Sequence, residues 1–165
     1  MTVVADSGPI ISFARAGHLD LVRQAFNQLV IPEAVFEEIT ARGQDKPGAA
    51  DVRQGSWIKR MTVQDRSLLE KMPGKLNLGE REAIALAKEA GGYLLVDEIE
   101  ARKEALRLGI RCFGSLRVLK EAKDRGFITE AKPVLDQIIA SGTYLSDDLY
   151  QDFLRLVGEE YISQR

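Results

Sequence analysis

The chain has 165 residues, of which 45% are hydrophobic and 29% are charged, and its formal net charge is −2. This composition is typical of an ordinary soluble globular protein, and the charge excludes a globally basic surface for nucleic acid, so a polyanion would have to bind a local patch. A single cysteine, Cys112, cannot form an intramolecular disulfide. The N-terminus lacks the features of a signal peptide, and no apolar run approaches the roughly 18 residues that span a bilayer. We therefore expect a cytoplasmic protein that does not enter a membrane.

Strands and helices alternate along the first three quarters of the chain. Short apolar runs rich in β-branched residues predict buried strands, which are expected at residues 3–4, 29–31, 57–63, 93–96 and 110–113. The run at 57–63 could be an edge strand, although its alternation is weak. Helical periodicity with caps and breakers predicts helices at residues 9–16, 19–26, 33–42, 65–72, 77–90, 98–108, 115–125, 132–140 and 147–157.

This order of elements predicts the fold class. Alternating strands and helices indicate an α/β protein with a mostly parallel sheet, covered on both faces and joined by right-handed crossovers. From about residue 126 the pattern is helical only, which predicts a helical C-terminal part. No repeat, low-complexity tract or linker divides the sequence, so residues 1–165 are expected to form a single domain.

Two of the predicted strands end on an aspartate that precedes a helix. Asp6 follows Val3 and Val4, and Asp97 follows the apolar run at residues 93–96. After Asp6 the chain can turn at Ser7 and Gly8 into a helix. Ligands of open α/β sheets bind outside the carboxyl ends of the strands. If the two strands are near neighbours, both aspartates lie at one binding edge.

A helical wheel identifies two further acids that face the protein body. On the helix after Pro32, Glu38 flanks the buried direction while Glu37 points to solvent. On the helix that begins near residue 77, Glu80 is aligned with its apolar i+4 and i+7 neighbours, and Glu82 falls on the opposite side. A buried carboxylate is costly unless it is paired or binds a cation, so one member of each acidic pair is a candidate ligand.

Each acid also has a purely structural explanation. Asp6 could accept hydrogen bonds from its own turn, and Glu38 could pair with Arg42 at i+4. Asn77 with Glu80 has the spacing of a capping box, and Asp97 with Glu100 repeats it. For the four acids together, separate capping roles that all happen to direct acidic oxygens to one edge are the less economical explanation.

Clustered acids without a nucleophile motif favour metal-dependent hydrolysis. Mg²⁺ prefers oxygen ligands, and two-metal hydrolysis of phosphodiesters needs carboxylates but no covalent nucleophile. His18 is the only histidine and is more typical of a surface or capping residue, and no glycine-rich phosphate-binding motif occurs. A surplus of lysine and arginine between residues 101 and 125 could hold phosphates near Asp97, although for any single side chain a solvated pair, such as Glu98 with Arg102, explains it better.

Four segments and their order resemble the PIN-domain proteins. They are residues 3–9 (VVADSGP), 31–39 (IPEAVFEEI), 78–87 (LGEREAIALA) and 94–102 (LLVDEIEAR), and the Gly114-Ser115-Leu116 run and helical tail are also similar to a subfamily of small bacterial and archaeal PIN-like proteins. The resemblance implies an α/β/α sandwich and a ribonuclease activity that depends on Mg²⁺ or Mn²⁺. It also implies RNA, single-stranded or structured, as substrate. Many relatives are toxins of toxin–antitoxin pairs, so an antitoxin protein is an expected partner, and a homodimer is a further candidate assembly.

The resemblance assigns roles to individual residues. Asp6, Glu38 and Glu80 match the first three acids of the family, and Asp97 falls at the fourth acidic region. The third acid is commonly aspartate in the wider family, and a hydroxyl residue often precedes the last one, where this chain has Val96. Asp97 or Glu98 is therefore the fourth candidate metal ligand.

The function expected from these residues is a metal-dependent endoribonuclease. Asp6, Glu38, Glu80 and Asp97 are its candidate catalytic acids, and Ser7 or Arg102 is expected to place a phosphate. The competing hypothesis is a catalytically weak PIN-like module that binds RNA or protein. A phosphatase is disfavoured, because the opening segment lacks a second aspartate two residues after Asp6.

Overall fold

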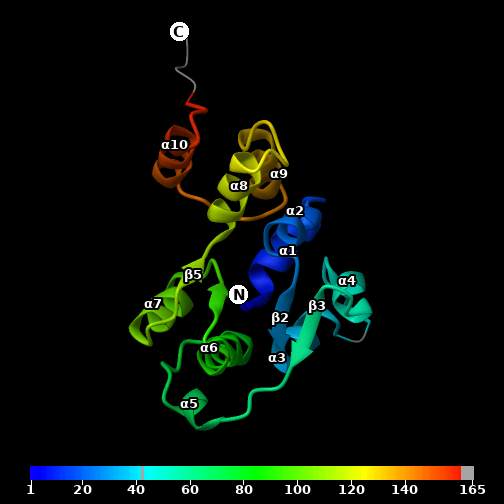
Figure 1. The fold of residues 1–165 in the computed structure, drawn as a ribbon, viewed down its shortest axis with the longest axis vertical. Coiled ribbons are helices and arrows are strands. Elements are labelled where there is room, and N and C mark those ends of the chain that lie inside the picture. Colours follow the sequence, from blue (N-terminus) through cyan, green and yellow to red (C-terminus); the bar gives the residue numbers. More distant parts are fainter. Residues whose placement is uncertain (42, 161–165) are drawn as a thin grey trace.

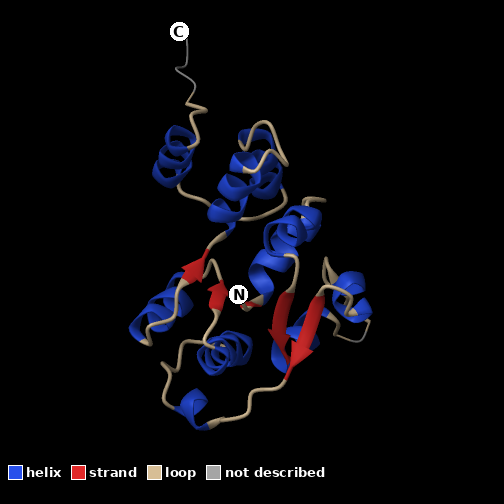
Figure 2. Cartoon of the chain, in the orientation of Figure 1, coloured by secondary structure: helices blue, strands red, loops and turns tan. Residues whose placement is uncertain are grey.

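The computed structural model describes residues 1–41 and 43–160. Five parallel strands form one sheet with the order β3-β2-β1-β4-β5 (Figures 1 and 2). Their bounds are β1 Val3–Ala5, β2 Leu29–Pro32, β3 Ile58–Met61, β4 Tyr93–Leu95 and β5 Cys112–Phe113. All five strands lie at predicted positions, and β3 is an edge strand, as predicted for residues 57–63.

Helices cover both faces of this sheet, because successive strand residues point to opposite sides. Val3 and Ala5 belong to one apolar core with α1, α2, α3, α4 and the C-terminal helices, while Val4 belongs to a second core with α5, α6 and α7. The helices are α1 Ser7–Arg15, α2 Leu19–Phe26, α3 Glu33–Ile39, α4 Ala49–Gln54, α5 Ser67–Glu70, α6 Leu78–Ala90, α7 Ile99–Arg107, α8 Ser115–Asp124, α9 Lys132–Ala140 and α10 Asp147–Leu156. The predicted α/β class with a parallel, doubly covered sheet is confirmed.

Two helices differ from the sequence prediction. Helix α1 begins at Ser7 rather than at Pro9, with Asp6 as its N-cap residue. Helix α4 was not predicted, because its six residues follow a polar loop and bury only Ala49 and Val52. Short helices of this kind depend on packing against the rest of the fold rather than on their own periodicity.

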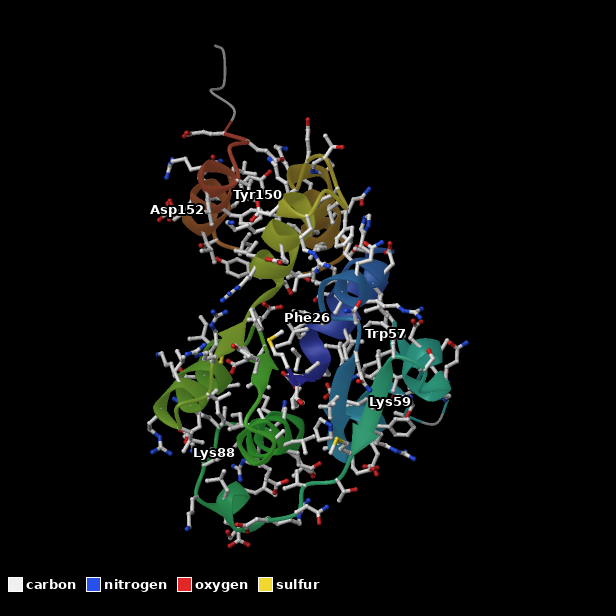
Figure 3. All side chains as sticks on the ribbon, in the orientation of Figure 1. Phe26, Trp57, Lys59, Lys88, Tyr150 and Asp152 are labelled. Carbon is white, nitrogen blue, oxygen red and sulfur yellow. The ribbon has the colours of Figure 1, made fainter. Side chains whose placement is uncertain are left out.

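The chain beyond Gly126 is helical in its described part, and α9 and α10 stand at one end of the molecule, away from α5 and α6 (Figure 1). The Tyr150 hydroxyl of α10 donates to Asp136 of α9 at 2.6 Å, whereas Asp152 lies on the outer side of α10 (Figure 3). None of the described helices is long and apolar enough to cross a bilayer.

The neighbouring positions of β1 and β4 decide where the two strand-end aspartates lie. Ala5 pairs with Leu95 in the parallel register, and the Asp6 N–H donates to the Leu95 carbonyl at 3.0 Å. Asp97 follows two residues after the end of β4. Both aspartates therefore emerge from adjacent strands at the carboxyl edge of the sheet, as strand adjacency requires.

Candidate functional site: an acidic edge of the sheet

Asp6 is a buried acid at this edge. It lies between β1 and the first turn of α1, and the residue is 7% exposed. Burial, opposed by the Ser7 backbone N–H and reinforced by the carboxylates of Glu80, Glu38 and Asp97, raises the pKa of Asp6 to about 7. All three charged groups that shift this pKa are acids, so the four side chains lie close enough to repel one another.

Glu80 reaches the edge from the first turn of α6. Its backbone N–H donates to Asn77 Oδ1 at 2.8 Å, and its Oε1 accepts from the Asn77 N–H at 2.9 Å, so the predicted capping box is present. Glu80 is also 7% exposed, and its pKa is raised, first by burial and then by Glu98 and Glu38. The capping explanation and the inward orientation are therefore both correct for this residue.

Glu38 lies on the more open side of the edge. Its side chain is 34% exposed and pairs with Lys46 at 3.5 Å, and a Cβ at Gly79 would stand 3.4 Å from its Oε2. Its contact with Gly79 places Glu38 beside the start of α6. The alternative partner, Arg42, lies outside the described residues. Glu37 is exposed, as the helical wheel predicted.

Asp97 and Glu98 have different surroundings, and the predicted capping pair of Asp97 with Glu100 is wrong. The cap of α7 is Glu98, whose Oε2 accepts from the Ala101 N–H at 2.7 Å. Asp97 instead accepts from Ser115, from its N–H at 2.7 Å and its hydroxyl at 2.5 Å. The helix begins one residue later than the pattern suggested, which leaves Asp97 free to turn toward α8.

Ser7 and Arg102, the expected phosphate-binding residues, lie at the same edge. Ser7 is 7% exposed and is the first residue of α1. The Arg102 guanidinium lies against the backbone of Gly114, where an added Cβ would be 2.7 Å from its Nη1 and 3.2 Å from Asp97 Oδ1. The anticipated Glu98–Arg102 ion pair is absent from the described part of the chain, because Glu98 is turned back to cap α7.

Most of the basic side chains between residues 101 and 125 have partners within the protein. Lys103, Arg107, Lys120 and Lys123 form ion pairs with acids, and Arg125 donates to carbonyls of α2. The solvated-pair explanation is therefore correct for Lys103 and Lys120, whereas Arg107 and Lys123 pair with buried acids. Arg102 and Arg117 lie near the start of α7 and α8, and the Arg117 guanidinium stands 4.3 Å from the centre of the Phe113 ring.

Glu82 corrects the helical-wheel analysis. It is 4% exposed rather than solvent-facing, and it accepts from the Ala34 N–H at 3.1 Å and pairs with Arg66 at 3.2 Å. The wheel assumed one buried stripe, whereas α6 packs against the sheet on one side and α3, α5 and α7 on others. Glu80 and Glu82 are consequently both buried, and Glu82 links α6 to α3.

The described acids at the edge do not form a complete set of ligands for one ion. Within residues 1–41 and 43–160, no three His, Cys, Asp or Glu side chains are grouped closely enough to hold one ion. Asp97 is engaged by Ser115, Glu80 by Asn77, and Glu38 by Lys46. Sequence analysis missed Ser115, although the glycine before it, at the end of a predicted strand, signals a close backbone approach.

These features define a class: a parallel α/β protein with acidic side chains gathered at the carboxyl edge of its sheet. The model of the DUF3368 family of PIN domains matches residues 2–159, and the chain therefore belongs to the PIN-domain family. No curated protein matches the sequence. Among solved structures, the chain is similar to a PilT N-terminus domain protein, SSO1118, from the hyperthermophilic archaeon Sulfolobus solfataricus P2, with a TM-score of 0.53 and 15% identity over 88% of this chain and 98% of that one. At this identity the likeness shows the fold alone.

Proposed function

We propose that the protein is a metal-dependent endoribonuclease that hydrolyses RNA phosphodiester bonds at the acidic edge. The observation that carries this proposal is the environment of Asp6, a buried carboxyl whose charged neighbours Glu38, Glu80 and Asp97 are all acids. Burial of mutually repelling carboxylates is unfavourable by itself. A bound cation would offset the repulsion between these carboxylates. The family to which the chain belongs also has a nuclease-type fold.

The donor set fits Mg²⁺ or Mn²⁺. Carboxylate oxygens are the hard ligands that these ions take, usually one or two with several waters. Asp6 and Asp97 from the strand ends would hold the ions directly, with Glu38 and Glu80 as direct or water-mediated ligands and Glu98 as the alternative fourth acid. When bound, such ions supply an activated water and stabilise the leaving oxygen of a phosphodiester.

The remaining roles fall to neighbouring polar groups. Arg102 lies against Gly114 and beside Asp97, where its guanidinium can bind a phosphate of the substrate in a bidentate manner. The Ser7 hydroxyl at the first turn of α1 orients a second oxygen. Both side chains emerge next to an acid, so phosphate and carboxylates share the edge.

The proposed partners follow from this activity. RNA, single-stranded or structured, is the substrate, and the protein acts in the cytoplasm. An antitoxin protein that silences the site, or a second copy of the chain, completes the proposal for a toxin of a toxin–antitoxin pair. A small reading frame adjacent to the gene, whose product co-purifies with this chain and blocks cleavage, would support the toxin assignment.

A second function is favoured by one observation. The described side chains include no group of three that could hold an ion as they stand. A PIN-like module that binds RNA or protein without cleaving it would need no such group. This alternative retains Arg102 as a phosphate contact and dispenses with the metal.

An RNA cleavage assay separates the two functions. A labelled single-stranded RNA is incubated with purified protein and Mg²⁺ or Mn²⁺, and cleavage is expected in the wild type and reduced at least about 100-fold in Asp6→Asn, because a buried acid of the edge is lost. Glu37→Gln is the matched control: it removes an exposed acid one residue from Glu38 and should cleave normally. Intact RNA with every metal, combined with a gel shift, would replace the nuclease by the binding module.

A further inference from the structure

The carboxylate of Asp97 is held at both oxygens by one residue from a different element. The Ser115 N–H donates to Oδ1 at 2.7 Å and the Ser115 hydroxyl donates to Oδ2 at 2.5 Å. Asp97 lies in the loop after β4, whereas Ser115 is the first residue of α8, after β5. Two donors in fixed positions determine the plane of the carboxylate, and hydrogen bonds to a charged acceptor are the strong ones.

Gly114 allows this close approach. A Cβ at this position would stand 3.2 Å from Asp97 Oδ1 and 2.7 Å from Arg102 Nη1, so a side chain would push both groups away. The glycine therefore lets the connection between β5 and α8 pack directly against the acid and the arginine. Gly114 and Ser115 therefore form the surface against which the Asp97 carboxylate lies.

Glu98 is held differently. Its Oε2 accepts from the Ala101 N–H of its own helix at 2.7 Å, which is the ordinary role of an N-cap residue, and its carboxyl also lies beside Glu80 of α6, whose pKa it helps to raise. Asp97 accepts instead from the first residue of α8, so its orientation depends on a segment that follows it by 18 residues.

We propose that Ser115 is the positioning residue for Asp97 at the cation site, an inference that rests on the proposed nuclease function. Ser115 acts through Asp97 and does not contact the substrate. Partners that orient a ligating carboxylate typically change metal affinity or activity by about 10- to 100-fold when they are removed. Loss of the Ser115 hydroxyl should have an effect of this size, because the N–H remains to hold one oxygen.

The test is Mn²⁺ binding, measured by titration calorimetry on the full chain, together with the kinetics of RNA cleavage. Ser115→Ala should weaken Mn²⁺ binding by about 10- to 100-fold and lower kcat with little change in the KM for RNA. Ser115→Thr retains the hydroxyl and should restore both. The matched control is Ser67→Ala, which removes a bond of the same type, from the Ser67 hydroxyl to Asp65 at 2.6 Å, at the exposed start of α5.

A second pair of variants makes the test independent of how Ser115 variants fold. Asp97→Asn should weaken Mn²⁺ binding at least as much as Ser115→Ala does, because Ser115 acts through Asp97, whereas Glu98→Gln should leave the effect of Ser115→Ala unchanged. A smaller loss of affinity in Asp97→Asn than in Ser115→Ala, or wild-type Mn²⁺ affinity in folded Ser115→Ala, would overturn the inference while leaving the nuclease in place. A wild type that neither binds Mn²⁺ nor cleaves RNA would overturn the proposed function and this inference with it.

Discussion

Two sets of buried acids in this protein behave in opposite ways. Glu82, Glu104 and Glu159 are each buried against cations and N–H donors, whereas Asp6 is buried against other acids. Glu82 and Glu159 link neighbouring helices and Glu104 pairs with Arg107 within α7, whereas no cation is among the charges that shift the pKa of Asp6. Burial alone therefore does not distinguish a functional acid from a structural one. The sign of the neighbouring charges does.

The C-terminal end supplies the clearest structural acid. Glu159 pairs with Lys123 at 2.8 Å and accepts from the backbone N–H groups of Ala131 and Lys132, at 2.8 and 2.9 Å, at the start of α9. Burial acts to raise the pKa of Glu159, but Lys123 and the two N–H groups outweigh it, and the pKa is lowered. This contribution to stability is present above the ordinary pKa of a glutamate and is lost as the pH falls.

The largest expected change is therefore at Glu159. Glu159→Ala should lower the free energy of unfolding by about 3 to 5 kcal/mol, because it leaves Lys123 and two helix N–H groups without their acceptor. Glu159→Gln retains one acceptor oxygen and should lose roughly half as much. Urea denaturation at pH 7 measures both losses. If Glu159→Ala unfolds at the same urea concentration as the wild type, the structural role assigned to this acid is wrong.

For Asp6, the dependence of protein stability on pH should have the opposite sign. Its pKa is raised from 3.8 to about 7, so the contribution of its neutral form is complete below the unfolded pKa and is lost as the pH rises through 7. Asp6→Asn should accordingly stabilise the metal-free protein by about 2 kcal/mol at pH 8 and by much less at pH 5. Thermal unfolding in the presence of a chelator, measured at pH 5 and at pH 8, tests this difference.

Glu82→Gln is the matched control for that experiment. It changes an acid that is equally buried but paired with Arg66, so it should destabilise the protein instead. Stabilisation by both substitutions would mean that any buried acid is unfavourable in this fold. The contrast between the two sets of acids would then disappear.

Sequence patterns were sufficient for the sheet and for the edge where the acids lie. Short β-branched runs that end on Asp6 and Asp97 are local signals, and parallel strands bring their carboxyl ends together. The burial of Glu80 could be derived from its i+4 and i+7 neighbours. These inferences depend only on the local pattern of apolar residues, which the folded structure retains.

Contacts between distant segments could not be predicted in the same way. The burial of Glu82 depends on Ala34 and Arg66, and the orientation of Asp97 depends on Ser115, and none of these pairs is visible in a single helical wheel. Local spacing also misassigned the cap of α7, because Asp97 with Glu100 satisfies the capping-box rule, whereas Glu98 is followed three residues later by Ala101 and does not. The tertiary hydrogen bonds between Asp97 and Ser115 override this local pattern.

The central claim is that the acids at the sheet edge gather to bind a divalent cation, and thermal unfolding with and without Mn²⁺ tests it most directly. At about 100 times its dissociation constant the ion should stabilise the wild type by about 2.7 kcal/mol, which corresponds to a rise in Tm of roughly 5 to 10 °C for a chain of this size. Asp6→Asn should lose most of that rise. An unchanged Tm in the wild type, or an equal rise in Asp6→Asn, would contradict the account.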